Sequence, residues 1–139
     1  MRVMVLVKAT AESEAGKHGD EKLFGEMSRY NEELVKAGVL VAGEGLHPTS
    51  KGKRVRFSGA TRTVVDGPFA ETKELVAGFW VWQVRSMDEA VQWLKRAPFD
   101  VADVEIRPIF EAADFGDALS PELRAKEESL RAQVAAKAR

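Results

Sequence analysis

The chain has 139 residues, of which 45% are hydrophobic and 31% are charged, and its formal net charge is −1. A chain of this length buries about 68–70% of its unfolded surface in one core, and this composition argues against both a disordered and a membrane protein. The small net charge excludes a general attraction to nucleic acid. Because the sequence contains no cysteine, disulfides and thiol redox chemistry are excluded as well.

No segment of the sequence has the length of a membrane span or the pattern of a signal peptide. The longest uncharged apolar run, 75–84, is half of the ~20 residues that a bilayer-spanning helix needs. The apolar stretch after Met1 is short, and no small-residue cleavage site follows it. We therefore expect a cytoplasmic protein that binds no membrane.

The first half of the chain predicts a strand, a helix, a second strand and a hairpin. Residues 3–8 form a strand that is apolar on both faces. Helical spacing governs 20–37, with acidic residues at its start and Gly38 as its stop. A strand follows over 39–46, and two alternating segments around "GAT", "KRVRFS" and "RTVVD", predict a hairpin.

The second half predicts a strand, a helix, a strand and a terminal helix. Residues 75–84 form a strand with two apolar faces, one of them bearing Trp80 and Trp82. Ser86 and Glu89 have the spacing of a capping box that opens a helix ending before Pro98. A strand over 104–110 follows, and Ser120 caps a charged tail helix.

This order predicts an α+β fold, a ferredoxin-like split βαβ sheet with an inserted β-hairpin and a C-terminal helix. Residues 1–115 would form the domain, and 116–139 a helical extension. In this topology, the first and third core strands lie in the centre of the sheet. These are the two strands that are apolar on both faces.

The two apolar faces also predict a homodimer. Both helices must pack on one face to keep right-handed crossovers, and we assign Trp80 and Trp82 to the other face. Exposing that face would leave a larger apolar patch than monomers tolerate, so we expect a second subunit to cover it. The tail helix is the competing cover.

Two long segments of the sequence resemble a known family. "AGVLVAGEGLHPTSKGKRVRF", followed by "VVDGPFAETKELVAGFW" and "DVEIRPIFE", is similar to the DGPF branch of the YCII-related proteins. The resemblance extends nearly to Phe110, and the DGPFAETKE string is specific. It implies a dimeric α+β barrel with an active or ligand site in the cleft between sheet and helices.

The resemblance also implies that this chain differs from shorter relatives at two site positions, and that it has a regulatory protein partner. Shorter YCII relatives are proposed to pair a histidine in the first helix with an aspartate before a proline. This chain has Met27 and Ala97 at the matching positions, and neither can transfer a proton. Relatives of the DGPF branch are often encoded beside extracytoplasmic-function sigma factors, which implies a regulatory link.

The DGPFAETKE stretch has a functional and a structural interpretation. In the functional one, Asp66 and Glu71 bind polar or cationic ligand groups, and Lys73 pairs with an anionic one. In the structural one, Asp66 caps a turn through its carboxylate, and the other charged residues form a solvated surface. We weigh the two equally.

Glu44 and His47 are candidates for acid–base catalysis beside Asp66. Histidine is the common proton carrier near neutral pH, and a nearby carboxylate would raise its pKa. Three residues apart on a strand, however, the two side chains point to opposite faces, and surface exposure is the more ordinary role of such a histidine. With two histidines and no cysteine, no metal site is expected.

The preferred hypothesis is therefore a pocket for a small polar molecule, walled by aromatic residues and capable of acid–base chemistry without a cofactor. Its expected walls and rim are Phe69, Phe79, Trp80, Trp82, Glu44, His47, Asp66, Glu71, Lys73 and Arg107. The alternative is a non-enzymatic interaction module linked to a sigma factor, which would dock through its tail helix and hairpin.

Overall fold

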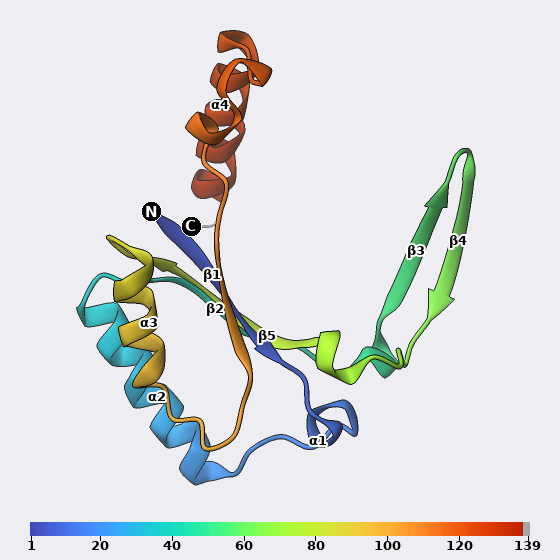
Figure 1. Ribbon diagram of the computed structural model, residues 1–139, viewed down its shortest axis with the longest axis vertical. Helices are drawn as coiled ribbons and strands as arrows, with labels where there is room; N and C mark the ends of the chain where they lie inside the picture. Colours follow the sequence, from blue (N-terminus) through green and yellow to red (C-terminus); the bar gives the residue numbers. More distant parts are fainter. Residues whose placement is uncertain (138–139) are drawn as a thin grey trace. The chain divides into compact units, whose positions relative to one another are not determined.

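The structure, a computed structural model, describes residues 1–137. It consists of two compact units, Met1–Pro108 and Ile109–Arg139. The first unit contains six strands and three α-helices, shown in Figure 1. The strands are β1 (Arg2–Lys8), β2 (Leu40–Gly45), β3 (Lys53–Ser58), β4 (Thr61–Asp66), β5 (Val76–Gln83) and β6 (Val104–Pro108). The helices are α1 (Ala11–Glu14), α2 (Glu21–Lys36) and α3 (Met87–Lys95).

Four strands form one antiparallel sheet in the order β2-β5-β1-β6. This is the strand order of the predicted split βαβ topology, with β1 and β5 in its centre. The α+β fold class predicted from the sequence is confirmed. The short helix α1 was not predicted, because its four residues lie in a segment that reads as a polar loop.

Local signals set the ends of the main helices. The Asp20 carboxylate accepts a hydrogen bond from the Leu23 backbone N–H at 2.9 Å at the start of α2, and Gly38 takes a φ of 72° just after its end. At the start of α3, the Ser86 hydroxyl accepts from the Glu89 N–H at 3.1 Å. The Glu89 carboxylate instead binds Arg85 at 2.7 Å, so the capping interaction is only partly the predicted one.

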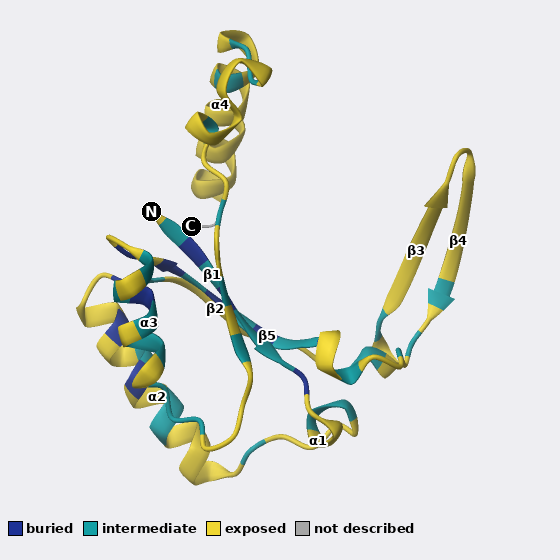
Figure 2. Ribbon diagram, in the orientation of Figure 1, coloured by how far each residue is buried: buried dark blue, intermediate teal, exposed yellow. Residues whose placement is uncertain are grey.

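The core lies between the sheet and the helices α2 and α3. Val3 and Val5 of β1 pair with Trp82 and Trp80 of β5, and all four pack with Tyr30 and other side chains of the helices. Figure 2 shows the buried residues on the sides of the strands and helices that face each other. The predicted position of the indoles is therefore wrong. Trp80 and Trp82 lie on the helix-covered face, not on the open one.

The opposite face of the sheet carries smaller apolar side chains. Leu6 faces Phe79 across the β1–β5 ladder, and Met4 faces Val81. All four are half-buried. Alternation along a strand shows that both faces are apolar but not which face the helices cover. The larger indoles go under the helices because burying them removes the most apolar surface from water.

The inserted hairpin forms a separate two-stranded sheet. β3 and β4 pair from Lys53–Asp66 to Ser58–Thr61, so Thr61 belongs to the strand and the loop is shorter than predicted. Gly59 in that loop has a φ of 59°, a conformation that glycine adopts without strain. The hairpin is exposed over almost its whole length (Figure 2).

The base of the hairpin is held by the turn that carries the DGPF sequence. The backbone N–H of Gly67 donates to the Gly52 carbonyl at 3.0 Å, and that of Phe69 donates to the Thr49 hydroxyl at 3.0 Å. The Glu14 carboxylate accepts from the Thr49 N–H at 3.0 Å. A Cβ atom at Gly67 would lie 1.7 Å from the Thr49 carbonyl oxygen, so only glycine fits there.

The second unit contains the 3₁₀ segment η3 (Ala112–Ala118) and the helix α4 (Pro121–Lys137). The Ser120 hydroxyl accepts from the Leu123 N–H at 3.2 Å, as its predicted capping role requires. The rings of Phe110 and Phe115 stack with centroids 4.9 Å apart. Leu130 and Val134 on α4 are exposed.

The packing at Gly67 predicts the effect of two glycine substitutions. Gly67→Ala is expected to lower the free energy of unfolding by about 1–3 kcal/mol, because the new methyl group meets backbone that cannot yield. Gly25→Ala on α2 meets no atom within 4 Å and is expected to raise it by about 0.5–1 kcal/mol through helix propensity. Urea denaturation measures both changes.

Hydrogen exchange locates the effect of the same pair. In Gly67→Ala, protection should fall over 53–66 first, because the turn anchors the hairpin. Unchanged exchange of the hairpin amides in a destabilised Gly67→Ala protein would contradict this role of the turn.

Candidate functional site

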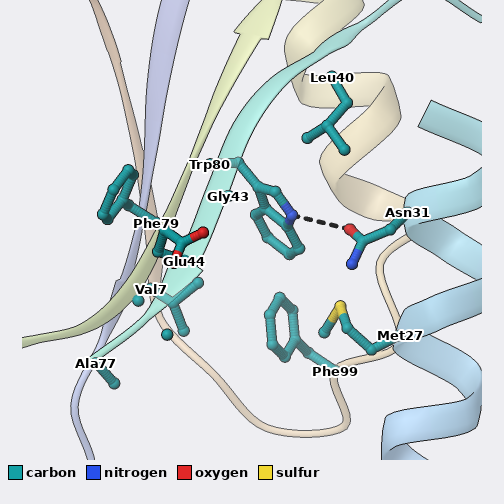
Figure 3. A pocket seen from close by; sticks show the side chains of 12 residues that line it. Val7, Met27, Asn31, Leu40, Gly43, Glu44, Ala77, Phe79, Trp80 and Phe99 are labelled. Atoms are coloured by element: carbon teal, nitrogen blue, oxygen red, sulfur yellow. Dashed lines mark hydrogen bonds between the residues drawn. The ribbon is translucent and has the colours of Figure 1, made fainter. Parts of the chain in front are cut away.

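A cavity of about 310 Å³ lies between the sheet and α2 (Figure 3). Its volume falls at the lower end of the range for small-molecule sites. Residues of β1, β2, β5 and α2, together with Phe99 after α3, surround it. They are Val7, Met27, Asn31, Leu40, Gly43, Glu44, Gly45, Ala77, Gly78, Phe79, Trp80 and Phe99.

Three glycines leave the floor of the cavity without side chains. Gly43 pairs with Trp80 across the β2–β5 ladder, and Gly45 pairs with Gly78. A Cβ atom at Gly43 would lie 2.7 Å from the Trp80 ring, whereas one at Gly45 would meet nothing within 4 Å. Gly43 therefore makes room for the indole, and Gly45 leaves open space. A flat molecule can lie against bare backbone at this point.

Part of the cavity wall is aromatic and apolar. The Trp80 ring packs edge-on against Tyr30 and Phe99, with centroids 5.8 and 6.1 Å away. The Met27 side chain comes down from α2 beside Phe99 (Figure 3). Such edge-to-face contacts fix the rings in place, and a thioether adapts to the shape of an aromatic guest.

Asn31 provides the polar side chain of the cavity. Its Oδ1 accepts a hydrogen bond from the Trp80 indole Nε1 at 3.0 Å. Asn31 is half-buried on α2, one turn after Met27. Its amide nitrogen lies on the side away from the indole, toward Met27 (Figure 3).

The Glu44 carboxylate does not point into the cavity. Glu44 pairs with Phe79 across the ladder, and Figure 3 shows both side chains on the far side of the sheet from Trp80 and Asn31. Glu44 lines the cavity through its backbone. Since it is the only titratable residue among those that line it, no acid or base faces the space within the part of the chain described.

The predicted site residues of the DGPFAETKE stretch lie at the base of the hairpin. Asp66 forms an ion pair with Lys53 across the β3–β4 ladder, and both side chains are largely exposed. Phe69 lies beneath the Arg54 guanidinium, with 3.8 Å from the carbon to the ring centroid, a cation–π contact. Glu71 and Lys73 are exposed at η2 (Thr72–Glu74). None of these four predicted residues lines the cavity.

The other predicted residues are spread over the first unit. His47 is exposed in the loop after β2. Arg107 lies on β6, opposite Met4 on the open face, with its Nε 3.8 Å from the Glu105 carboxylate. Trp82 is fully buried, and its indole N–H has no hydrogen-bond partner among the described residues. Of the predicted aromatic walls, Trp80 alone presents its ring to the cavity.

Sequence reasoning missed Asn31, Met27 and Phe99 as residues of the site. One signal was present for Asn31, which stands at helical spacing between Met27 and Leu34 on the inward stripe of α2. A polar residue on an apolar stripe indicates a specific hydrogen bond. Phe99 follows α3 in an irregular segment, where periodicity gives no information.

Comparison with known proteins identifies the family. Residues 1–113 match the YCII-related domain. The chain belongs to the YCII-related family. It is also 35% identical over 96 residues to "Uncharacterized protein R00369" of Rhizobium meliloti (strain 1021), which covers 67% of this chain and 77% of that protein.

A similar solved structure has low sequence identity to this chain. It is 5-chloro-2-hydroxyhydroquinone dehydrochlorinase (TftG) from Burkholderia phenoliruptrix AC1100, in complex with 2,5-dihydroxybenzoquinone. The sequence identity is 18%, the match covers 81% of this chain and 98% of that chain, and the TM-score is 0.39.

The two positions at which the resemblance implies a difference from shorter YCII relatives are Met27 and Ala97. Met27 lines the cavity, and Ala97 packs half-buried against the core. An aliphatic thioether and a methyl group thus stand where the resemblance implies an acid–base pair. Apart from Asn31, the side chains that face the cavity are apolar or aromatic.

No group of three or more His, Asp or Glu that could hold a metal ion occurs within residues 1–137, and none of their helices has the length and apolar character of a membrane span. A second hollow, of about 580 Å³, lies within the second unit between η3 and α4. The cavity over the glycine floor is the candidate site, because it is built from the central strands of the family domain.

The alkaline stability of the protein tests the packing around Trp80. Tyr30, the only tyrosine of the sequence, donates its hydroxyl to the Trp93 carbonyl at 2.6 Å, and burial raises the pKa of Tyr30. The unfolded chain ionises at a lower pH than the folded one, so stability is complete below the ordinary tyrosine pKa of about 10 and falls as the pH rises above it.

Tyr30→Phe is accordingly expected to lower the free energy of unfolding by about 1 kcal/mol at neutral pH. Above pH about 10, the free energy of unfolding of this variant should fall less steeply with pH than that of wild type. Urea denaturation at several pH values measures both effects. Equal alkaline slopes in the two proteins would show that Tyr30 is not held neutral by the core.

Proposed function

We propose that this YCII-related protein binds a small, flat and mainly apolar molecule in the cavity between the sheet and α2. The observation that carries the proposal is the open space at Gly45, where a Cβ atom would meet nothing within 4 Å, in a cavity that its partner Gly78 and the aromatic residues Trp80 and Phe99 also line. A strand that needed only to pack against α2 would fill this space with side chains. Glycines at paired positions keep it open.

Binding is the part of the sequence hypothesis that the cavity supports. The predicted acid–base chemistry by Asp66, His47 and Glu44 needs a proton carrier next to the ligand. Glu44 points to the opposite face, and the other two residues do not line the cavity. Turnover by these residues stays a prediction, and we do not extend the proposal to it.

We also propose that the protein is a homodimer through the open face of the sheet, the face expected to pair, although Trp80 and Trp82 do not lie on it. The open face of the sheet has an apolar centre of Met4, Leu6, Phe79 and Val81. Charged side chains surround this centre: Glu44 lies on β2, and Lys8, Glu105 and Arg107 lie near β6. An apolar centre with a charged rim is the composition of a protein interface. The opposite charges of Glu44 and Arg107, on opposite edges of the sheet, suit a second copy packed face to face.

The alternative of an interaction module linked to a sigma factor stays a prediction. The exposed hairpin agrees with it in general terms, because a two-stranded ribbon is marginally stable without further contacts. The cavity is the more specific feature.

Filling the cavity from its floor tests the binding proposal. Acetophenone, which is flat and fits the space, is expected to bind with an affinity in the millimolar to high-micromolar range. Gly45→Val should weaken it at least tenfold, because the new side chain enters the open space. Titrations followed by ¹H–¹⁵N spectra of the tryptophan indole and asparagine amide groups measure the affinity.

Ala42→Val is the matched control. Ala42 lies on β2 like Gly45 and pairs with Val81 of β5, so the added methyl groups lie on the open face and should leave binding unchanged. Equal affinity of wild type and Gly45→Val, with both proteins folded, would remove the cavity as the site.

The dimer proposal predicts the mass in solution. Sedimentation should give about twice the 15.3 kDa of the chain at micromolar concentration. Leu6→Glu should shift the mass to the monomer, because a charge at the centre of an apolar interface is left unpaired. A wild-type protein that sediments as a monomer would contradict the proposal.

A further inference from the structure

We infer that Trp80 fixes the Asn31 amide with its NH₂ group toward the cavity, and that the site therefore selects flat molecules presenting a hydrogen-bond acceptor, such as a carbonyl or phenolate oxygen. The inference rests on the proposed function and adds the chemical class of the ligand. It concerns one interaction, between Asn31 and Trp80.

The orientation of the amide follows from the chemistry of the indole. An indole N–H donates and cannot accept, whereas an asparagine side chain has an oxygen that accepts and a nitrogen that donates. The Trp80 Nε1 lies 3.0 Å from the Asn31 Oδ1. Turning the amide would place two donors against each other, so the oxygen faces Trp80 and the nitrogen faces away.

The indole itself has little freedom to move. Trp80 is 6% exposed, and its ring contacts those of Tyr30, Trp82 and Phe99 at centroid distances of 5.8, 5.6 and 6.1 Å. The absence of a side chain at Gly43 makes room for the edge of the indole ring, because a Cβ atom at Gly43 would lie 2.7 Å from that ring. The amide is thus held by a fixed donor.

The free end of the amide is the polar feature that a ligand meets. Among residues 1–137, the Asn31 NH₂ group has no hydrogen-bond partner, and it points toward Met27 at the side of the cavity (Figure 3). The Glu44 carboxylate, the one charged group among the lining residues, lies on the other face of the sheet. A ligand that displaces water from this NH₂ group must replace the lost hydrogen bond or leave the donor unpaired.

Acceptors are therefore favoured over apolar molecules of the same shape. Acetophenone and α-methylstyrene form a matched pair of probes, because a C=CH₂ group replaces the C=O group and the outline is retained. Aniline is the probe that presents donors. For each protein, the dissociation constants of two probes are expressed as a ratio. Because both probes carry the same phenyl ring, this ratio cancels any change in how well that ring fits the cavity.

The decisive variant is Asn31→Asp, which keeps the acceptor for Trp80 and turns an oxygen toward the cavity. At pH 8 the preference for acetophenone over α-methylstyrene should fall by about threefold to tenfold relative to wild type, the effect of one hydrogen bond. In Asn31→Asp, the affinity for aniline should rise relative to the affinity for α-methylstyrene. Trp80→Phe removes the N–H donor and so frees the Asn31 amide to turn. The preference of this variant for acetophenone over α-methylstyrene should therefore lie between those of wild type and Asn31→Asp.

The wild-type protein gives an independent readout if a variant does not fold. Acetophenone should shift the Asn31 NH₂ protons downfield, and α-methylstyrene should not. An unchanged probe ratio in Asn31→Asp, or an Asn31 NH₂ signal that acetophenone does not shift downfield although it binds, would overturn the inference and leave the proposed function standing. If neither probe binds the wild-type protein, both fail.

Discussion

The position of Trp80 between the sheet and α2 is the constraint on which the rest of the site depends. The indole is wedged between the rings of Tyr30, Trp82 and Phe99, and its N–H holds Asn31 on the helix. A side chain of this size separates the helix from the strands. Where the sheet beside it carries glycine instead of a side chain, the separation leaves a cavity.

The charged DGPFAETKE motif and the cavity are formed by different parts of the first unit. The turn containing Asp66 and Gly67 binds the backbone near Thr49 and anchors the hairpin. The Asp66 carboxylate pairs with Lys53 and not with the turn backbone, and Glu71 and Lys73 are exposed. The cavity, by contrast, is formed by residues with little chemical reactivity. The acid–base pair that the resemblance implies for shorter relatives has no counterpart at Met27 and Ala97.

Periodicity predicted the elements of the sheet and helices well, because their signals are local. The acidic start of α2, the cap at Ser86, the stop at Gly38 and the central position of β1 and β5 all follow from residue types at fixed spacings. The face of Trp80 could not be predicted in this way. A strand with apolar residues on both sides has no asymmetry in its pattern, and the choice between the faces depends on side-chain volume across three elements.

The candidate site was less predictable for a related reason. Sequence reasoning sought charged residues near an apolar strand and so favoured Asp66, Glu71 and Lys73, which the fold carries to the hairpin base. The lining residues come from five separate parts of the chain, and most are apolar. The pairing of Gly45 with Gly78 becomes visible only once the β2–β5 register is known.

The two faces of the sheet can be distinguished directly by nuclear Overhauser effects from bound acetophenone to methionine methyl groups. Met27 lines the cavity and Met4 lies on the open face. A ligand held between the sheet and α2 gives contacts to the Met27 methyl group and none to Met4. Contacts confined to Met4, with Met27 silent, would place the ligand on the wrong side of the sheet and contradict the proposed site.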